Sequence, residues 1–253
     1  MKWRIVLLGM LLSWLSGCVT TGDVNPLDSK DGRAKAVQAY VQLGVGYLQQ
    51  RATERAKNPL QKALDLDPSN ADANAALAMV FQIEMEPELA DKHYRTALSE
   101  SDNQTRILNN YGSFLFDQKE FEKAHEYFLK ASADTMYEGR SRVFENLGMT
   151  ALKMNQRDKA KHYFQKALRL DPTLPNSLLE AGMLAYEDKD YVPSRDFYNR
   201  YEKVGDQTAR SLLLGIRLAA VYDERDVAAS DALQLKRLYP ASPEYQQYLL
   251  EQK

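Results

Sequence analysis

Side chains able to carry out catalysis or to bind a metal ion are few in this 253-residue sequence. It contains one cysteine, Cys18, and three histidines, His93, His125 and His162. A single thiol excludes an intrachain disulfide and a multi-cysteine metal site, and the histidines fall at different phases of the predicted helices. The sequence has no nucleophile elbow, phosphate-binding loop or H-E-x-x-H motif. We therefore expect no enzyme activity, no metal ion, no cofactor and no small-molecule substrate.

The overall composition excludes several further classes of protein. There are 33 lysines and arginines against 35 aspartates and glutamates, a net charge of -2, so the balance gives no sign of nucleic-acid binding by counterion release. With 44% hydrophobic and 27% charged residues the chain has an ordinary globular composition. Collagen, a disordered tail and a multispanning membrane protein are excluded.

The cysteine ends an N-terminal segment that is typical of exported proteins. Lys2 and Arg4 precede an apolar run that is shorter than the roughly 20 residues of a transmembrane helix. Residues 1–17 are therefore predicted to be a secretory signal peptide. The sequence Leu-Ser-Gly-Cys at 15–18 resembles the bacterial lipobox, which implies lipidation of Cys18. The alternative is an unmodified cysteine behind an ordinary signal peptide.

The lipobox resemblance also implies a location for the protein. Two or three acyl chains hold a protein on a membrane almost permanently. Val19 stands where an aspartate retains lipoproteins of diderm bacteria at the inner membrane. The resemblance thus implies a lipid anchor in the outer membrane, on its periplasmic side. Residues 18–36 are polar and contain glycine and proline, and we expect a flexible tether there.

From Val37 onward the sequence repeats itself at intervals of 34, 34, 36, 34 and 34 residues. Three columns of equivalent residues carry the repeat, and the alternative, a generic amphipathic bundle, gives no reason for them. The glycine column is Gly44, Ala78, Gly112, Gly148, Gly182 and Ile216; the alanine column is Ala56, Ala90, Ala124, Ala160, Ser194 and Ala228; and the aromatic column is Leu60, Tyr94, Phe128, Phe164, Tyr198 and Ala232.

This order of small and aromatic residues resembles the tetratricopeptide repeat, a helix-turn-helix unit of 34 residues. The resemblance implies an all-α superhelix of six units at 37–70, 71–104, 105–138, 141–174, 175–208 and 209–242. A capping helix is expected at 243–253. Repeats five and six depart from the pattern, and Pro59 should kink the second helix of repeat one or shift its start.

In such an array the first helix of each unit lines a concave face, and repeat positions 2, 5, 9, 12 and 13 point into it. These positions place an apolar groove on the N-terminal half, which suits an extended or helical peptide of a partner protein. The alternative is that the same side chains are core between helices. The residues expected to bind the partner are Val41, Val45, Leu48, Met79, Ile83 and Phe116.

An export signal with a lipobox, followed by six repeats, resembles the type IV pilus biogenesis lipoproteins of the PilF/PilW family. Three segments carry the resemblance, at residues 43–48, 62–68 and 109–115. It implies a pilotin, which binds secretin subunits through the concave groove and promotes their localisation and multimerisation in the outer membrane. The rival interpretation is a lipoprotein scaffold for periplasmic cell-wall enzymes, which the same anchor and repeats would serve equally well.

Overall fold

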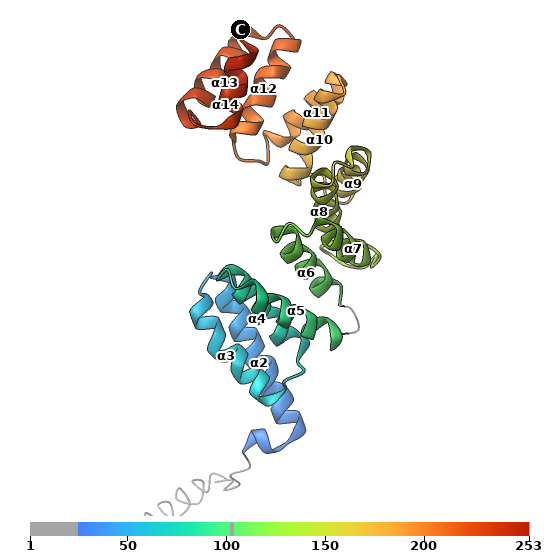
Figure 1. Ribbon diagram of the computed structural model, residues 1–253, viewed down its shortest axis with the longest axis vertical. Helices are drawn as coiled ribbons and strands as arrows, with labels where there is room; N and C mark the ends of the chain where they lie inside the picture. The colour runs from blue at the N-terminus through green and yellow to red at the C-terminus, as the bar shows by residue number, and fades with distance from the viewer. Residues whose placement is uncertain (1–24, 102–103, 253) are drawn as a thin grey trace, which may run out of the picture.

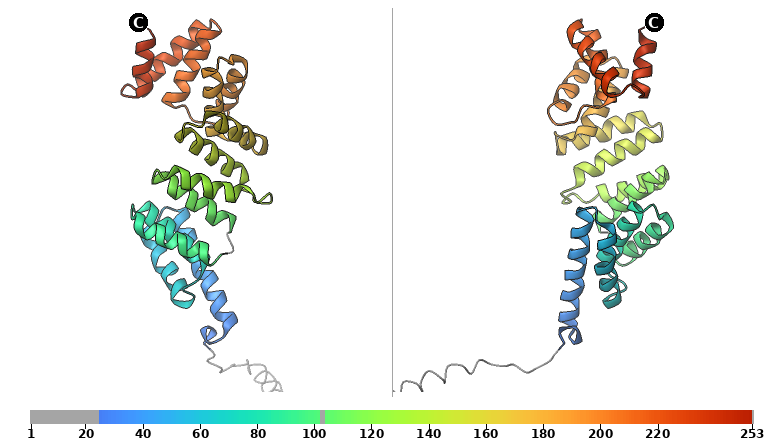
Figure 2. Two further views of the ribbon diagram at one scale, coloured as in Figure 1. Left: turned by 45° about the vertical axis from the view of Figure 1, so that its right-hand side comes forward. Right: turned by 90° about the vertical axis from the view of Figure 1, so that its left-hand side faces the viewer.

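The computed structural model describes residues 25–101 and 104–252, and within these ranges the only regular elements are helices. A 3-10 turn at Pro26–Asp28 is followed by α-helices that stack as antiparallel pairs into an elongated array (Figures 1 and 2). The first member of each pair is an A helix and the second a B helix. The A helices are α2 (Lys30–Gln49), α4 (Ala71–Ile83), α6 (Thr105–Asp117), α8 (Arg140–Lys153), α10 (Pro175–Glu187) and α12 (Ala209–Val221); the B helices are α3 (Thr53–Leu66), α5 (Pro87–Ser99), α7 (Phe121–Ser132), α9 (Arg157–Leu170), α11 (Tyr191–Tyr201) and α13 (Arg225–Leu238).

The expected all-α array of six helix pairs with a capping helix is confirmed. The capping helix is α14 (Pro243–Glu251), which begins behind Ser242. The Ser242 hydroxyl accepts a hydrogen bond of 3.1 Å from the Tyr245 backbone N–H and so satisfies one of the free donors of the first turn.

Each A helix turns into its B helix through one residue with a positive φ. These residues recur at the same intervals as the sequence repeat, and none of them is glycine. They are Arg51, Met85, Lys119, Asn155, Lys189 and Asp223, with φ between 55° and 65°. A left-handed residue at this position ends the A helix and reverses the chain.

The glycine and aromatic columns meet inside each unit. A Cβ on Gly44, Gly112 or Gly148 would lie closer than 3.0 Å to Leu60, Phe128 or Phe164 respectively. The large residue of the B helix therefore occupies the space that a side chain on the A helix would need. Tyr94 also reaches the next unit, because its ring lies 5.4 Å from that of Tyr111.

Repeat six keeps the same packing with the two sizes exchanged. Ile216 replaces the glycine and is buried, while Ala232 replaces the aromatic residue and packs against the same cluster. The two positions at which repeat six departs from the pattern therefore compensate each other: the A helix gains side-chain volume where the B helix loses it. A close-packed core tolerates such an exchange better than either change alone.

The start of the array differs from the sequence-based expectation. The flexible tether predicted for residues 18–36 is wrong from Lys30 onward, because α2 begins there. Ser29 is its N-cap and accepts a bond of 2.9 Å from the Gly32 backbone N–H, and Asp31 pairs with Lys35 at 2.7 Å. These polar residues stabilise a first turn that has little apolar surface to bury. Cys18 and the predicted signal peptide lie outside the described residues.

Pro59 does not shift the start of its helix. Helix α3 begins at Thr53, in register with the other B helices, and continues through Pro59 to Leu66. The proline is buried beside Leu60. Its helix therefore keeps the register of the array despite the loss of one backbone donor.

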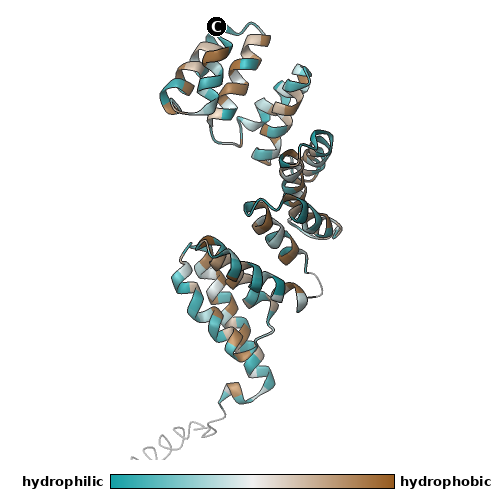
Figure 3. Ribbon diagram, viewed as in Figure 1, coloured by the Kyte–Doolittle hydropathy of each residue, from teal (hydrophilic) through white to brown (hydrophobic). Residues whose placement is uncertain are grey.

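Hydrophilic and hydrophobic residues are interspersed along the helices (Figure 3). The buried sides join into a core whose largest cluster extends from Ala78 in α4 to Leu218 in α12. Within the described ranges, no helix combines the length and the apolar character that crossing a bilayer requires.

Candidate functional site

Three clefts lie among the A helices of the first three repeats, two of them with shared lining residues, and we call the three together the N-terminal groove. The central cleft, of about 430 Å³, is lined by Val41 and Val45 of α2 and by Asp72 and Arg106 of the next two A helices. Because its lining comes from three successive A helices, the cleft lies on the face that these helices share. Two of the six residues predicted to bind a partner therefore meet in one cleft.

A second cleft, of about 610 Å³, extends the first toward the start of α2. Val41 belongs to both, and Val37, Gln38 and Gln42 add to the lining. Val37 is buried, while both glutamines are exposed. Gln42 was not singled out from the sequence, although it follows Gln38 by one helical turn and so shares its face.

The third cleft, of about 350 Å³, lies between α4 and α6. Met79 and Ile83 line it together with the hydroxyl-bearing ring of Tyr94. Ile83, the last residue of α4, is 52% exposed. Burial raises the pKa of Tyr94 far above that of a free tyrosine, so its hydroxyl stays protonated and donates to Gln82 Oε1 at 3.0 Å.

Two predicted binding residues have other roles. Leu48 is only 8% exposed and packs in a core cluster with Leu60 and Val80, so its assignment to the groove surface is wrong. The last turn of α2 approaches both α3 and α4, which covers this side chain. Phe116 is half-buried, and its ring packs edge-on against Phe121 at 5.3 Å.

Polar side chains of the groove differ between its two ends. On α4 and α6 they pair with one another, Arg106 with Asp72 and Gln82 Nε2 with Asp117 Oδ2 at 2.8 Å. The exposed amides of α2 form no side-chain hydrogen bond within residues 25–101 and 104–252; they are Gln38, Gln42 and Gln49. The α2 end of the groove therefore offers unused donors and acceptors beside apolar side chains.

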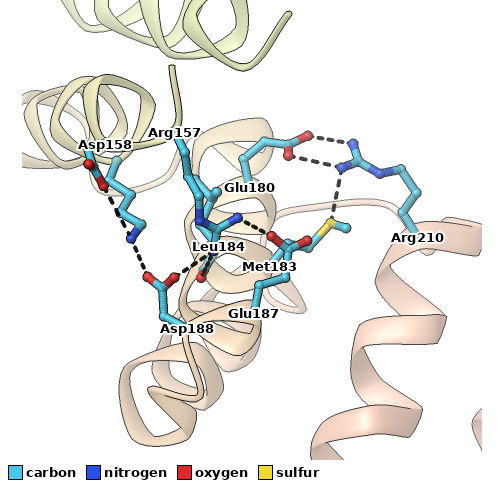
Figure 4. A network of polar contacts seen from close by, with 9 residues as sticks. Arg157, Asp158, Glu180, Met183, Leu184, Glu187, Asp188 and Arg210 are labelled. Atoms are coloured by element: carbon cyan, nitrogen blue, oxygen red, sulfur yellow. Dashed lines mark hydrogen bonds and ion pairs between the residues drawn. The ribbon is translucent and has the colours of Figure 1, made fainter. Parts of the chain in front are cut away.

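In the C-terminal repeats, charged side chains of neighbouring helices form ion pairs with one another. Arg210 of α12 forms two hydrogen bonds of 2.5 and 3.0 Å to Glu180 of α10, whose side chain is 6% exposed, and lies 3.1 Å from Met183 Sδ (Figure 4). Arg217 is paired with Glu251 of α14. Both arginines of α12 are thus paired with glutamates within the fold.

A second network joins α9 to α10. Arg157 donates to the Leu184 carbonyl at 2.7 Å and to Asp188 at 2.8 Å, and it pairs with Glu187 (Figure 4). Lys161 also pairs with Asp188, and the two cations lower the pKa of that carboxyl. These contacts cap the carboxyl end of α10.

Two of the three histidines serve packing, and His162 is exposed. His93 Nδ1 lies 2.9 Å from Asn74 Oδ1, and its ring stacks on Phe81. His125 Nε2 lies 3.3 Å from the hydroxyl of Tyr163. In the part of the chain that the structure describes, no group of three histidine, cysteine or acidic residues is arranged to hold a metal ion.

Comparison with known proteins defines the class of this array first. The tetratricopeptide repeat family matches residues 37–70, 103–173 and 146–209. A structure of YrrB, described as a tetratricopeptide-repeat protein with an unusual peptide-binding site, superposes with a TM-score of 0.59 at 17% identity, covering 75% of this chain and 96% of that one. The molecule is a tetratricopeptide-repeat solenoid, a fold whose common use is protein-protein interaction.

The relatives then narrow the class to a family. The type IV pilus assembly protein PilF of Pseudomonas aeruginosa strain PAO1 is 55% identical over 248 residues, which are 98% of each chain. A solved structure of Pseudomonas aeruginosa PilF superposes with a TM-score of 0.85 at 56% identity, covering 87% of this chain and 99% of that one. PilW, a type IV pilus biogenesis factor, superposes with a TM-score of 0.72 at 26% identity over 84% and 98% of the two chains. This chain belongs to the PilF family of type IV pilus assembly proteins.

Proposed function

We propose that this protein is an outer-membrane lipoprotein that acts as a pilotin for the secretin of a type IV pilus. In this proposal Cys18 carries the lipid anchor, and the N-terminal groove binds a secretin subunit. The anchor determines where the pair is delivered, and bringing subunits together at the outer membrane promotes their multimerisation. The proposal rests on the lipobox at residues 15–18 and on membership of a family of pilus assembly proteins.

The observation that carries the proposal is the open inner face of α2. No helix pair precedes α2 within the described residues, so Val41 and Val45 line clefts that are not filled by a neighbouring repeat. Aliphatic side chains of a partner would gain roughly 25 cal/mol per Å² of apolar surface buried there. The free amides of Gln38 and Gln42 lie beside these valines and match the hydrogen-bonding groups of a peptide backbone.

The anchor is tested in cells by blotting for detergent-resistant secretin multimers. Cells carry the wild-type protein, no protein, or Cys18→Ala. The pilotin proposal expects multimers with the wild type, none without the protein, and lost or mislocalised multimers with Cys18→Ala. Unchanged multimers in all three strains would contradict it, and altered cell shape or division would favour a scaffold for cell-wall enzymes.

A further inference from the structure

Helix α9 is charged differently from the rest of the array. It carries five lysines and arginines against one carboxylate, Asp158, in a chain whose net charge is -2. Two of these cations, Arg157 and Lys161, are used in the network with α10. The remaining cations lie with a histidine in what we call the α9 stripe, defined as Lys159, His162, Lys166 and Arg169.

The stripe follows a single face of the helix. Its members are separated by three, four and three residues, which places them in one row about 15 Å long. The opposite side of α9 is the buried one, with Ala160, Phe164 and Ala167 at 0% exposure. The row therefore faces away from the core, and as part of a B helix it is separate from the N-terminal groove, which lies on the A helices.

The fold makes little use of the charges in the stripe. Within the described ranges, no carboxylate forms an ion pair with Lys159, Lys166 or Arg169. Lys166 alone has a partner, the face of the Phe144 ring, 5.1 Å from its Nζ. Lys159 adds to the effect of burial in lowering the pKa of His125. The stripe is therefore a concentration of positive charge without a structural counter-charge.

The neighbouring B helices show how the array normally treats these positions. On α7 the equivalent lysines are Lys123 and Lys130, and each is paired with a glutamate, at Glu120 and Glu126. On α11 the equivalent Arg200 lies 3.4 Å from Asp196. Cations on both flanking helices are thus neutralised locally, and those on α9 are not.

We propose that the α9 stripe binds an acidic segment of a partner protein. The width of the positive surface decides between the possible anionic partners. Glu126 on one side and Asp196 on the other are 62% and 65% exposed and are paired with Lys130 and Arg200, so the uncompensated positive charge does not extend beyond α9 to the width that a membrane surface would contact. An extended or helical segment rich in aspartate and glutamate is narrow enough to contact α9 alone.

Fluorescence anisotropy of a labelled twelve-residue oligoglutamate peptide tests this proposal with the full chain. We expect binding at low ionic strength that weakens steeply as salt is added. Lys159→Gln/Arg169→Gln removes two exposed charges and should weaken binding at least tenfold. The matched control, Lys123→Gln/Lys130→Gln, changes the net charge by the same amount on α7 and should weaken binding less than threefold. Thermal unfolding of both variants checks that they fold.

Three results would overturn the proposal. The first is a peptide that does not bind the wild-type protein at low salt. The second is an equal loss of affinity with both double variants, which would indicate a net-charge effect. The third is preferential binding of vesicles containing phosphatidylglycerol, with loss in the α9 variant only, which would assign the stripe to a lipid surface. This test does not involve the N-terminal groove, so its outcome is independent of the pilotin proposal.

Discussion

Replacing either of two glycines in the A helices by alanine should change the free energy of unfolding, but in opposite directions. A Cβ on Gly148 would lie closer than 3.0 Å to the buried ring of Phe164, whereas one on Gly46 would meet nothing within 4 Å. We expect Gly148→Ala to lower the free energy of unfolding by about 1–3 kcal/mol through overpacking. Gly46→Ala should raise it by about 0.5–1 kcal/mol, because alanine favours the helix. Urea unfolding of the two variants measures both, and destabilisation by Gly46→Ala would contradict the assignment.

Two histidines should make stability depend on pH. Burial, followed by the charge of Lys92, lowers the pKa of His93, and burial together with Lys159 lowers that of His125. The unfolded chain then binds more protons than the folded one below the ordinary histidine pKa of about 6.5. Stability should be complete above that pH and fall as the pH drops toward the lowered values. Melting temperatures measured between pH 7.5 and 5 test this.

The matched control for the pH effect is His93→Gln/His125→Gln. Its melting temperature should change less over the same pH interval than that of the wild type. His162, which is exposed, is left unchanged in both proteins. An equal decline in both proteins would assign the effect to carboxylates instead.

The ion pair of Arg210 with Glu180, which joins α12 to α10, should stabilise the fold more than the ion pair of Arg106 with Asp72, which joins α6 to α4. Glu180 is 6% exposed, so Arg210→Ala leaves a buried carboxylate without its cation. Asp72 and Arg106 are each about half exposed, and water can replace either partner. We expect Arg210→Ala to cost about 2–4 kcal/mol and Arg106→Ala less than about 1 kcal/mol. Denaturant unfolding compares them, and equal costs would contradict the role given to burial.

The sequence predicts the helices well because small and large residues recur in register. A glycine can face Phe128 or Phe164 only if the two helices stay in one alignment, so the period alone sets the pairing of the helices. The start of α2 was missed because its first turns have little apolar periodicity. The signals present there were the N-cap Ser29 and the pair of Asp31 with Lys35.

Only part of the groove could be predicted from the sequence, because residues that share its inner face differ in how deeply neighbouring helices bury them. Repeat positions place Val45, Leu48 and Ile83 on the same inner face, but they do not tell how closely neighbouring A helices approach. The last turn of α2 lies against α3 and α4, which buries Leu48 and leaves Val45 in a cleft. The hydroxyl of Tyr94 reaches the groove from a B helix, and no positional rule for A helices includes it.

Across the whole molecule, the two ends of the array have different properties. The N-terminal end exposes valines and free amides in adjoining clefts, and the C-terminal end pairs its arginines with glutamates of neighbouring helices. The proposed lipid at Cys18 would anchor the chain close to its N-terminal groove, because Cys18 precedes α2 in the sequence. This polarity favours capture of a partner at the N-terminal groove.

The central claim is that the N-terminal groove binds the secretin, and the most direct test is to measure multimers with a charged groove. Val45→Glu/Ile83→Glu places carboxylates in two clefts, while Leu43→Glu/Leu89→Glu places them on exposed leucines of α2 and α5 that line none of these clefts. Both variants should be folded and lipidated. We predict that detergent-resistant secretin multimers are lost with the groove variant and retained with the control. Wild-type multimers with a folded groove variant would contradict the account.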